Sequence, residues 1–174
     1  MTEAQTVTHI PYPYMPAKGM IRYVSADNPF MQAAKAVAAE QSLDTTMPTG
    51  SVIVRNNTII GKGANGSMYH ETHGCERVRL HIPTGQGYEL CEGCSPKNHS
   101  EPKAIADARK KTDDLHGAVV YLWGHWWCCE SCWNAMLAEG ITTVYLLENS
   151  EILFNKDAEG NIVGKQFLAY FAPL

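Results

Sequence analysis

The sequence predicts a three-layer α/β domain, and two observations support this fold class. Apolar runs typical of buried strands alternate with segments in which apolar residues recur at helical spacing. Along the chain the expected order is helix, hairpin, loop, helix, strand, helix and strand, an order that packs helices on both faces of one sheet. With 174 residues, the chain has the size of one such domain.

The chain is expected to begin with an irregular arm that wraps the domain, because residues 1–27 show no sustained period. A helix is expected over residues 28–41. Asn28 is a favourable N-cap residue, and Pro29 suits the first position of a helix.

A β-hairpin is expected next, formed by strands at 50–55 and 58–64. The two residues between them, Asn56 and Asn57, tolerate the left-handed backbone conformation of a tight turn. Residues 65–98, in contrast, have little periodicity. A structureless loop of this length inside a compact domain needs something that ties it down.

The second half of the chain predicts two more helices and two buried strands. The helices are expected at 100–111 and 129–139, and the strands at 118–123 and 142–147, where uninterrupted apolar runs indicate strands covered on both faces. Residues 148–174 form a C-terminal extension to which the sequence assigns no role.

Composition narrows the class of function. An apolar fraction of 45% and a charged fraction of 18% are typical of a soluble globular protein. The chain has no apolar run long enough for a bilayer and no signal peptide at its start, so we expect a cytoplasmic protein without a membrane partner. The net charge of −4 disfavours a large nucleic-acid interface, which usually needs a basic face.

Two short motifs thirty residues apart carry the strongest functional signal. His99 and Glu101 lie at the start of one expected helix, and Cys129 and Cys132 lie at the start of another. Helix N-termini stabilise thiolates. One imidazole and two thiolates hold zinc with a fourth position open for a catalytic water, and the remaining carboxylate is then placed to move protons. A redox-active cysteine pair is the alternative interpretation.

These motifs resemble the His-x-Glu and Pro-Cys-x-x-Cys motifs of the cytidine/deoxycytidylate deaminase superfamily. The resemblance covers about residues 28–147 and is closest to deoxycytidylate deaminases, whose Gly-x-Asn-Gly segment is similar to residues 63–66. It implies an α-β-α cytidine-deaminase-like fold with a mixed central sheet, with residues 65–98 as an inserted Cys/His-rich loop. It also implies a catalytic zinc at the three donors named above, with Glu101 as general base and acid.

The resemblance further implies that Asn65 binds the substrate through a hydrogen bond, although a plain Asn-Gly turn is equally compatible with the sequence. One residue departs from the family motif, because Cys128 replaces its proline. We expect Cys128 to be a buried thiol in the wall of the site. Trp126 and Trp127 could stack on a base, or at least one of them could belong to the core.

A second group of metal-binding side chains lies in the 65–98 loop. Cys75, Cys91 and Cys94, together with either His70 or His73, would complete a closed zinc site of the structural type. Such a site would order the loop, and some deoxycytidylate deaminases likewise carry a second, non-catalytic zinc. Unligated thiols are the alternative.

The family resemblance implies hydrolytic deamination with release of ammonia, and the Asn-Gly segment and long loop favour a cytosine nucleotide such as dCMP. Alternatives are another amino-base, as a nucleoside or within tRNA or single-stranded DNA, and a catalytically silent zinc-stabilised binding module. The expected partners are a small nucleotide and further copies of the same chain, whereas nucleic acid is not favoured. Arg77, Arg79 and Lys97 are candidates to meet a phosphate, or simply belong to a solvated loop.

Overall fold

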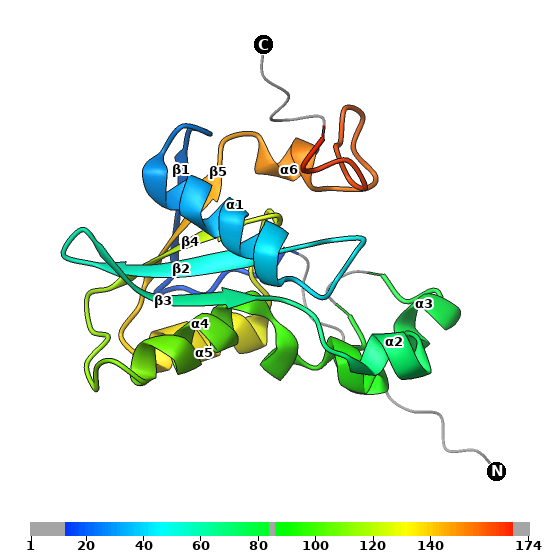
Figure 1. The fold of residues 1–174 in the computed structure, drawn as a ribbon, viewed down its shortest axis with the longest axis horizontal. Coiled ribbons are helices and arrows are strands. Elements are labelled where there is room, and N and C mark those ends of the chain that lie inside the picture. The colour runs from blue at the N-terminus through cyan, green and yellow to red at the C-terminus, as the bar shows by residue number, and fades with distance from the viewer. Residues whose placement is uncertain (1–12, 84–85, 169–174) are drawn as a thin grey trace.

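A five-stranded mixed sheet forms the centre of the molecule (Figure 1). The computed structural model describes residues 13–83 and 86–168. The strand order is β1-β5-β4-β2-β3. Strands β1 and β4 run parallel to β5, while β2 runs antiparallel to β3 and β4. The strands are β1 (Met20–Val24), β2 (Gly50–Arg55), β3 (Thr58–Ala64), β4 (Val119–Trp123) and β5 (Thr143–Leu147).

Helices cover both faces of this sheet. Helix α1 (Pro29–Gln41) packs against β2, β3 and β4 on one face, and the short α6 (Ser150–Leu153) lies on the same side. Helices α4 (Ser100–Arg109) and α5 (Glu130–Ala138) lie side by side on the other face (Figure 1). The expected three-layer α/β fold with a mixed sheet is therefore confirmed.

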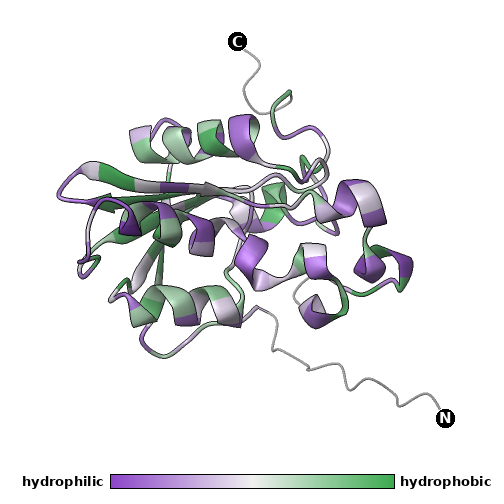
Figure 2. Cartoon of the chain, turned by 60° about the horizontal axis from the view of Figure 1, so that its bottom comes forward, coloured by the Kyte–Doolittle hydropathy of each residue, from purple (hydrophilic) through white to green (hydrophobic). Residues whose placement is uncertain are grey.

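The sheet separates two hydrophobic cores, because its central strands are buried on both faces. In β2, Val52 packs in the core beneath α1, and its neighbour Ile53 packs in the core beneath α4 and α5. Both side chains are fully buried. Figure 2 shows hydrophobic colour on strands of the sheet and a mixture of hydrophobic and hydrophilic residues on the helices that flank it.

Local sequence signals account for the first helix and the hairpin. The side-chain oxygen of Asn28 accepts hydrogen bonds from the backbone N–H groups of Phe30 and Met31, at 3.0 and 3.1 Å, and so caps α1. The hairpin turns at Asn56 and Asn57, whose φ angles of 50° and 60° place both in the left-handed region.

The expected irregular arm at 1–27 contains a strand that the sequence does not reveal. Residues 20–24 form β1, which pairs with β5 and lies at the edge of the sheet in the described part of the chain. Met20 and Tyr23 are about half exposed, so the strand lacks the continuous apolar run that marks β4 and β5. Tyr14, within the arm, packs against the core beneath α4 and α5. Residues 1–12 lie outside the described part of the chain.

The C-terminal extension contributes to the core on the α1 side. The rings of Phe154 and Phe167 both lie against Trp123, each with a centroid distance of 5.1 Å. Phe154 is fully buried by this contact. Among the helices that the structure describes, none combines the length and the apolar character needed to cross a membrane.

The segment expected to be a loop, residues 65–98, consists mainly of short helices at one end of the sheet (Figure 1). Each is too short to show a helical period, which explains why the sequence pattern does not reveal them. The segments are α2 (Tyr69–His73), α3 (Glu76–Arg79) and the 3-10 helices η1 (Tyr88–Leu90), η2 (Glu92–Cys94) and η3 (Pro96–Asn98).

Helix α4 approaches β3 so closely that only glycine fits at the contact. A Cβ atom at Gly63 would lie 2.4 Å from both the carbonyl oxygen of Ser100 and the backbone nitrogen of Ala104. We expect Gly63→Ala to push the first turn of α4 outwards and to lower the free energy of unfolding by about 1–3 kcal/mol, as overpacking typically does. Urea denaturation measures this. Lys62→Ala, at the exposed position beside Gly63, should change the free energy of unfolding by less than about 0.5 kcal/mol. If Lys62→Ala and Gly63→Ala lowered the free energy of unfolding equally, the close approach of α4 to β3 would not be the cause.

Candidate metal centre and active-site pocket

Three metal-binding side chains converge where α4 and α5 begin. His99 occupies the N-cap position of α4, and Cys129 occupies the N-cap position of α5. The Nδ1 atom of His99 lies 3.3 Å from Sγ of Cys132 and 3.5 Å from Sγ of Cys129, and the two sulfurs are 3.2 Å apart. The two motifs that are thirty residues apart in the sequence therefore form one cluster.

The spacing of these donors fits tetrahedral zinc. Bonds of about 2.3 Å to sulfur and about 2.0–2.1 Å to nitrogen place tetrahedral donors about 3.5–3.8 Å apart. The two distances from His99 to the sulfurs are within about 0.3 Å of the nitrogen–sulfur value at the lower end of that range. The two sulfurs are about 0.6 Å closer than the sulfur–sulfur value at its upper end. All six cysteines are free thiols, so Cys129 and Cys132 are not joined by a disulfide bond. Three protein donors leave the fourth position of such an ion open.

The electrostatics of the cluster favour a thiolate. The hydrogen bond with Cys132 outweighs the effect of burial and, together with His99, lowers the pKa of Cys129 to about 4. Because the thiolate is the form of cysteine that binds metal, this sulfur is ready to act as a ligand at neutral pH.

Glu101 lies beside this cluster and is held by a chain of two serines. Its side chain is buried, and its Oε2 atom accepts a hydrogen bond from Oγ of Ser100 at 3.1 Å. Since Ser100 donates its proton to the carboxylate, Oγ of Ser51, 2.7 Å away, must donate to Ser100. Burial, and then the negative charge of Cys129, raise the pKa of Glu101. A carboxyl group with a raised pKa can both accept and release a proton near neutral pH.

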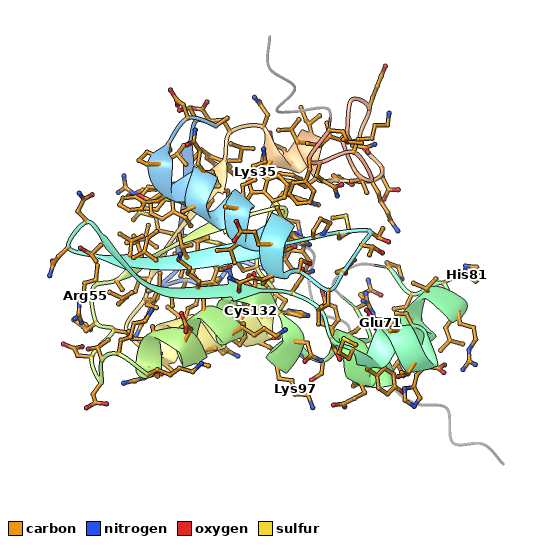
Figure 3. All side chains as sticks on the ribbon, in the orientation of Figure 1. Lys35, Arg55, Glu71, His81, Lys97 and Cys132 are labelled. Atoms are coloured by element: carbon orange, nitrogen blue, oxygen red, sulfur yellow. The ribbon has the colours of Figure 1, made fainter. Side chains whose placement is uncertain are left out.

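A pocket opens over the metal cluster. Its lining includes Glu101, His99 and Cys129 together with groups from the loop after β4 and from the 65–98 segment. Figure 3 labels Cys132 in the layer of α4 and α5, and shows Glu71 and His81 on the 65–98 segment, away from the sheet. This segment therefore supplies one wall of the pocket and also has a large solvent-exposed surface.

Asn65 lines the pocket, but its side chain is mostly committed to the scaffold. Its Oδ1 atom accepts hydrogen bonds from Oγ of Ser42 and from the backbone N–H of Thr49, at 2.6 and 2.8 Å. Its Nδ2 atom donates to the carbonyl oxygen of Met47 at 2.8 Å. Among the residues that the structure describes, none accepts a hydrogen bond from the second N–H of this amide.

We expect Asn65→Ala to lower the free energy of unfolding by about 2–3 kcal/mol, because three part-buried hydrogen bonds are lost at about 1 kcal/mol each. Urea denaturation measures the change. Asn134→Ala, at an exposed position of α5, serves as the control and should have an effect below about 0.5 kcal/mol. If the two variants were equally stable, Asn65 would not have the structural role described.

The three residues before Cys129 have different surroundings. Trp127 is buried and lines the pocket. Trp126 is not among the described lining residues, and it packs against both hydrophobic cores. Cys128 is a buried thiol that lies in the core and outside the group of metal donors.

A second group of metal-binding side chains lies in the 65–98 segment. The Nε2 atom of His70 is 3.3 Å from Sγ of Cys91 and 3.6 Å from Sγ of Cys94, and Cys75 and Cys94 are 3.5 Å apart. All four donor atoms lie within 4.8 Å of one another. His73 is exposed and stacks on Tyr69 instead, so the geometry selects His70 from the two histidines that the sequence left open.

The second cluster is connected to the first through Arg77 and Tyr88. The Nη1 atom of Arg77 lies 3.5 Å from Sγ of Cys94, and its guanidinium lies over the ring of Tyr88, 4.5 Å from the centroid. The ring of Tyr88 packs edge-on against His99, with a centroid distance of 4.9 Å and an interplanar angle of 81°. No local pattern in the sequence distinguishes Tyr88 as a residue of the site.

Comparison with known proteins agrees with this geometry. The family model described as "Cytidine and deoxycytidylate deaminase zinc-binding region" matches residues 24–148. The chain belongs to this deaminase family. The resemblance inferred from the two motifs is thus confirmed, and the zinc-binding family and the three-donor cluster together confirm Zn²⁺ as the cofactor. Residues 24–148 therefore form the zinc-binding region that is characteristic of this family.

The individual relatives of this chain are distant in sequence. ComE operon protein 2 of Bacillus subtilis (strain 168) is 28% identical over 122 residues, which are 70% of this chain. The match spans 59% of the length of that relative. The crystal structure of dCMP deaminase from the cyanophage S-TIM5 in its apo form has 19% identity, covers 72% of this chain and 86% of the other, and gives a TM-score of 0.45. The structure of guanine deaminase from Bacillus subtilis has 20% identity, covers 70% of this chain and 65% of the other, and gives a TM-score of 0.43.

Proposed function

We propose that this deaminase catalyses the zinc-dependent hydrolysis of a cytosine nucleotide such as dCMP to the uracil product and ammonia. The observation that carries the proposal is the buried carboxyl group of Glu101 beside a three-donor zinc cluster at the base of a pocket. A purely structural zinc site has no use for a buried acid that is not one of its ligands, because such a group is costly to bury.

In this proposal, His99, Cys129 and Cys132 hold the zinc ion. When bound there, zinc makes a water molecule acidic enough to ionise near neutral pH. Glu101 accepts the proton of the attacking water and passes it to the ring nitrogen next to the reacting carbon. A carbon–oxygen bond forms, Glu101 delivers the second water proton to the amino group, and the carbon–nitrogen bond breaks to release ammonia.

The pocket offers modest support for a phosphate on the substrate. Arg77 lines the pocket and donates through Nε to the carbonyl oxygen of Gln86 and through Nη2 to that of Pro83, both at 2.8 Å. With the contact to Cys94, three of its five N–H groups are engaged by residues that the structure describes, and no described residue engages the other two, which could meet an anion. Arg79 and Lys97 are exposed and form ion pairs with nearby glutamates, so they are not candidates for this role.

We also infer that His70, Cys75, Cys91 and Cys94 hold a second zinc ion with no open position. Four donors from this set close the coordination of a tetrahedral ion, as in sites that stabilise a fold. The ion would order the pocket wall. Assembly of several copies of the chain remains a prediction.

The test is ammonia release by the zinc-loaded protein across cytosine, adenine and guanine bases, nucleosides, nucleotides and short oligonucleotides. We expect the largest kcat/KM with a cytosine mononucleotide, and loss of turnover after chelation. Preference for another amino-base or for an oligonucleotide would replace the proposed substrate. Thiol–disulfide exchange that persists after chelation, without ammonia release beforehand, would instead support a redox role for Cys129 and Cys132.

A further inference from the structure

His125 lies in the turn that connects β4 to α5 and lines the pocket together with Glu101 and Asn65. The turn is held tightly, because Gly124 before it has a φ of 99° and a Cβ at that position would lie 2.2 Å from the carbonyl oxygen of Pro48. The imidazole therefore lines the pocket from a segment that packs closely against the backbone of Pro48.

Two backbone amides fix the protonation of this imidazole. The Nδ1 atom of His125 accepts hydrogen bonds from the N–H groups of Trp126 and Trp127, at 2.9 and 3.3 Å. A nitrogen that accepts hydrogen bonds carries no proton, so the single proton of the neutral ring is on Nε2. Removal from bulk water is the main cause that lowers the pKa of His125, to about 4. The ring is therefore neutral at physiological pH.

The Nε2–H group is left for a ligand. Within residues 13–83 and 86–168, the structure gives this nitrogen no hydrogen-bond partner, and the side chain is partly accessible from the pocket. A neutral imidazole that cannot easily gain a proton is unsuited to proton transfer. It is well suited to donating one hydrogen bond in a fixed direction.

We propose that His125 is a specificity-determining residue that donates from Nε2 to the ring carbonyl oxygen of the substrate base, an inference that rests on the proposed function. In cytosine, the ring nitrogen that receives a proton from Glu101 is flanked by the carbon bearing the amine and by the carbon bearing the carbonyl. A donor in the same pocket can read that carbonyl. Adenine has only a hydrogen at the corresponding carbon and would leave the buried donor unpaired, which is costly.

Two variants separate this role from a purely structural one. His125→Asn keeps a side-chain oxygen that can accept from the backbone amides of the turn, but it is too short to place a donor at the position of Nε2. His125→Gln places an amide N–H near the position of Nε2 but loses the acceptor at Nδ1. Each variant is assayed on a cytosine nucleotide and on its 2-thio analogue, whose sulfur is a weak acceptor.

We expect wild type and His125→Gln to prefer the oxo substrate over the thio analogue. His125→Asn should lower kcat/KM for the oxo substrate by about 10- to 100-fold. The ratio of kcat/KM for the oxo substrate to that for the thio analogue should then fall towards one. If both variants lower kcat/KM equally for the two substrates and the wild-type preference persists, the inference is wrong. Absence of ammonia release from any cytosine compound by wild type would instead overturn the proposed function, and this inference with it.

Discussion

Glu101→Gln is expected to lower kcat by about 10²–10⁴-fold while leaving the zinc content unchanged. The amide has nearly the same shape as the carboxyl group and can still accept the hydrogen bond from Ser100, but it cannot take up and release a proton. The side chain is not a member of the donor cluster, so the substitution removes no zinc ligand. Steady-state ammonia release and zinc determination by mass spectrometry measure the two quantities.

The chain offers a matched control in Glu130. Like Glu101, it lies in the first turn of a helix that carries zinc donors, but it is not among the described residues that line the pocket. Glu130→Gln should retain both turnover and zinc within about twofold. Near-normal turnover in Glu101→Gln would contradict its assignment as general base and acid, and loss of zinc in that variant would indicate a ligand role instead.

The sequence predicts an element well when the residues of that element, or those directly at its ends, carry the signal. Asn28 and Pro29 define the start of α1, and the asparagine pair at 56 and 57 defines the hairpin turn. Strands β4 and β5 are continuous apolar runs because both of their faces are buried. In these segments the information is local, so no knowledge of the rest of the fold is needed.

Strand β1 and the short helices of the 65–98 segment depend on distant contacts instead. Residues 20–24 become a strand only because β5, more than 110 residues later, offers an open edge. The choice between His70 and His73 likewise depends on where Cys91 is brought in space. Sequence spacing alone cannot make that choice.

The candidate site shows the same division. The donors and Glu101 could be predicted because two short motifs carry their chemistry at fixed spacing. The remaining walls of the pocket come from segments without such a motif, which is why Tyr88 and the role of His125 emerged only from the structure. For Asn65, the hydrogen bond to the substrate that the resemblance implied stays a prediction, whereas the structure shows three hydrogen bonds that hold the scaffold.

His70→Ala is expected to reduce the zinc content from two ions per chain to one and to lower kcat/KM by about 10- to 100-fold. The ion that His70, Cys75, Cys91 and Cys94 are proposed to hold contributes free energy to the order of the 65–98 segment. Without it, the contact between Tyr88 and His99 is loosened, and with it the orientation of a zinc ligand. Zinc determination and steady-state kinetics measure both effects, and hydrogen exchange should show faster exchange confined to residues 65–98.

His73→Ala is the matched control, because it removes the same side chain from the same short helix. His73 is exposed and packs on Tyr69 rather than on the cysteines, so this variant should retain two zinc ions and near-normal kinetics. Equal loss of zinc in both variants would show that zinc binding depends on the integrity of α2 and not on the imidazole of His70. A wild-type protein that binds one zinc ion with full activity would exclude the second site altogether, because the catalytic cluster accounts for that ion.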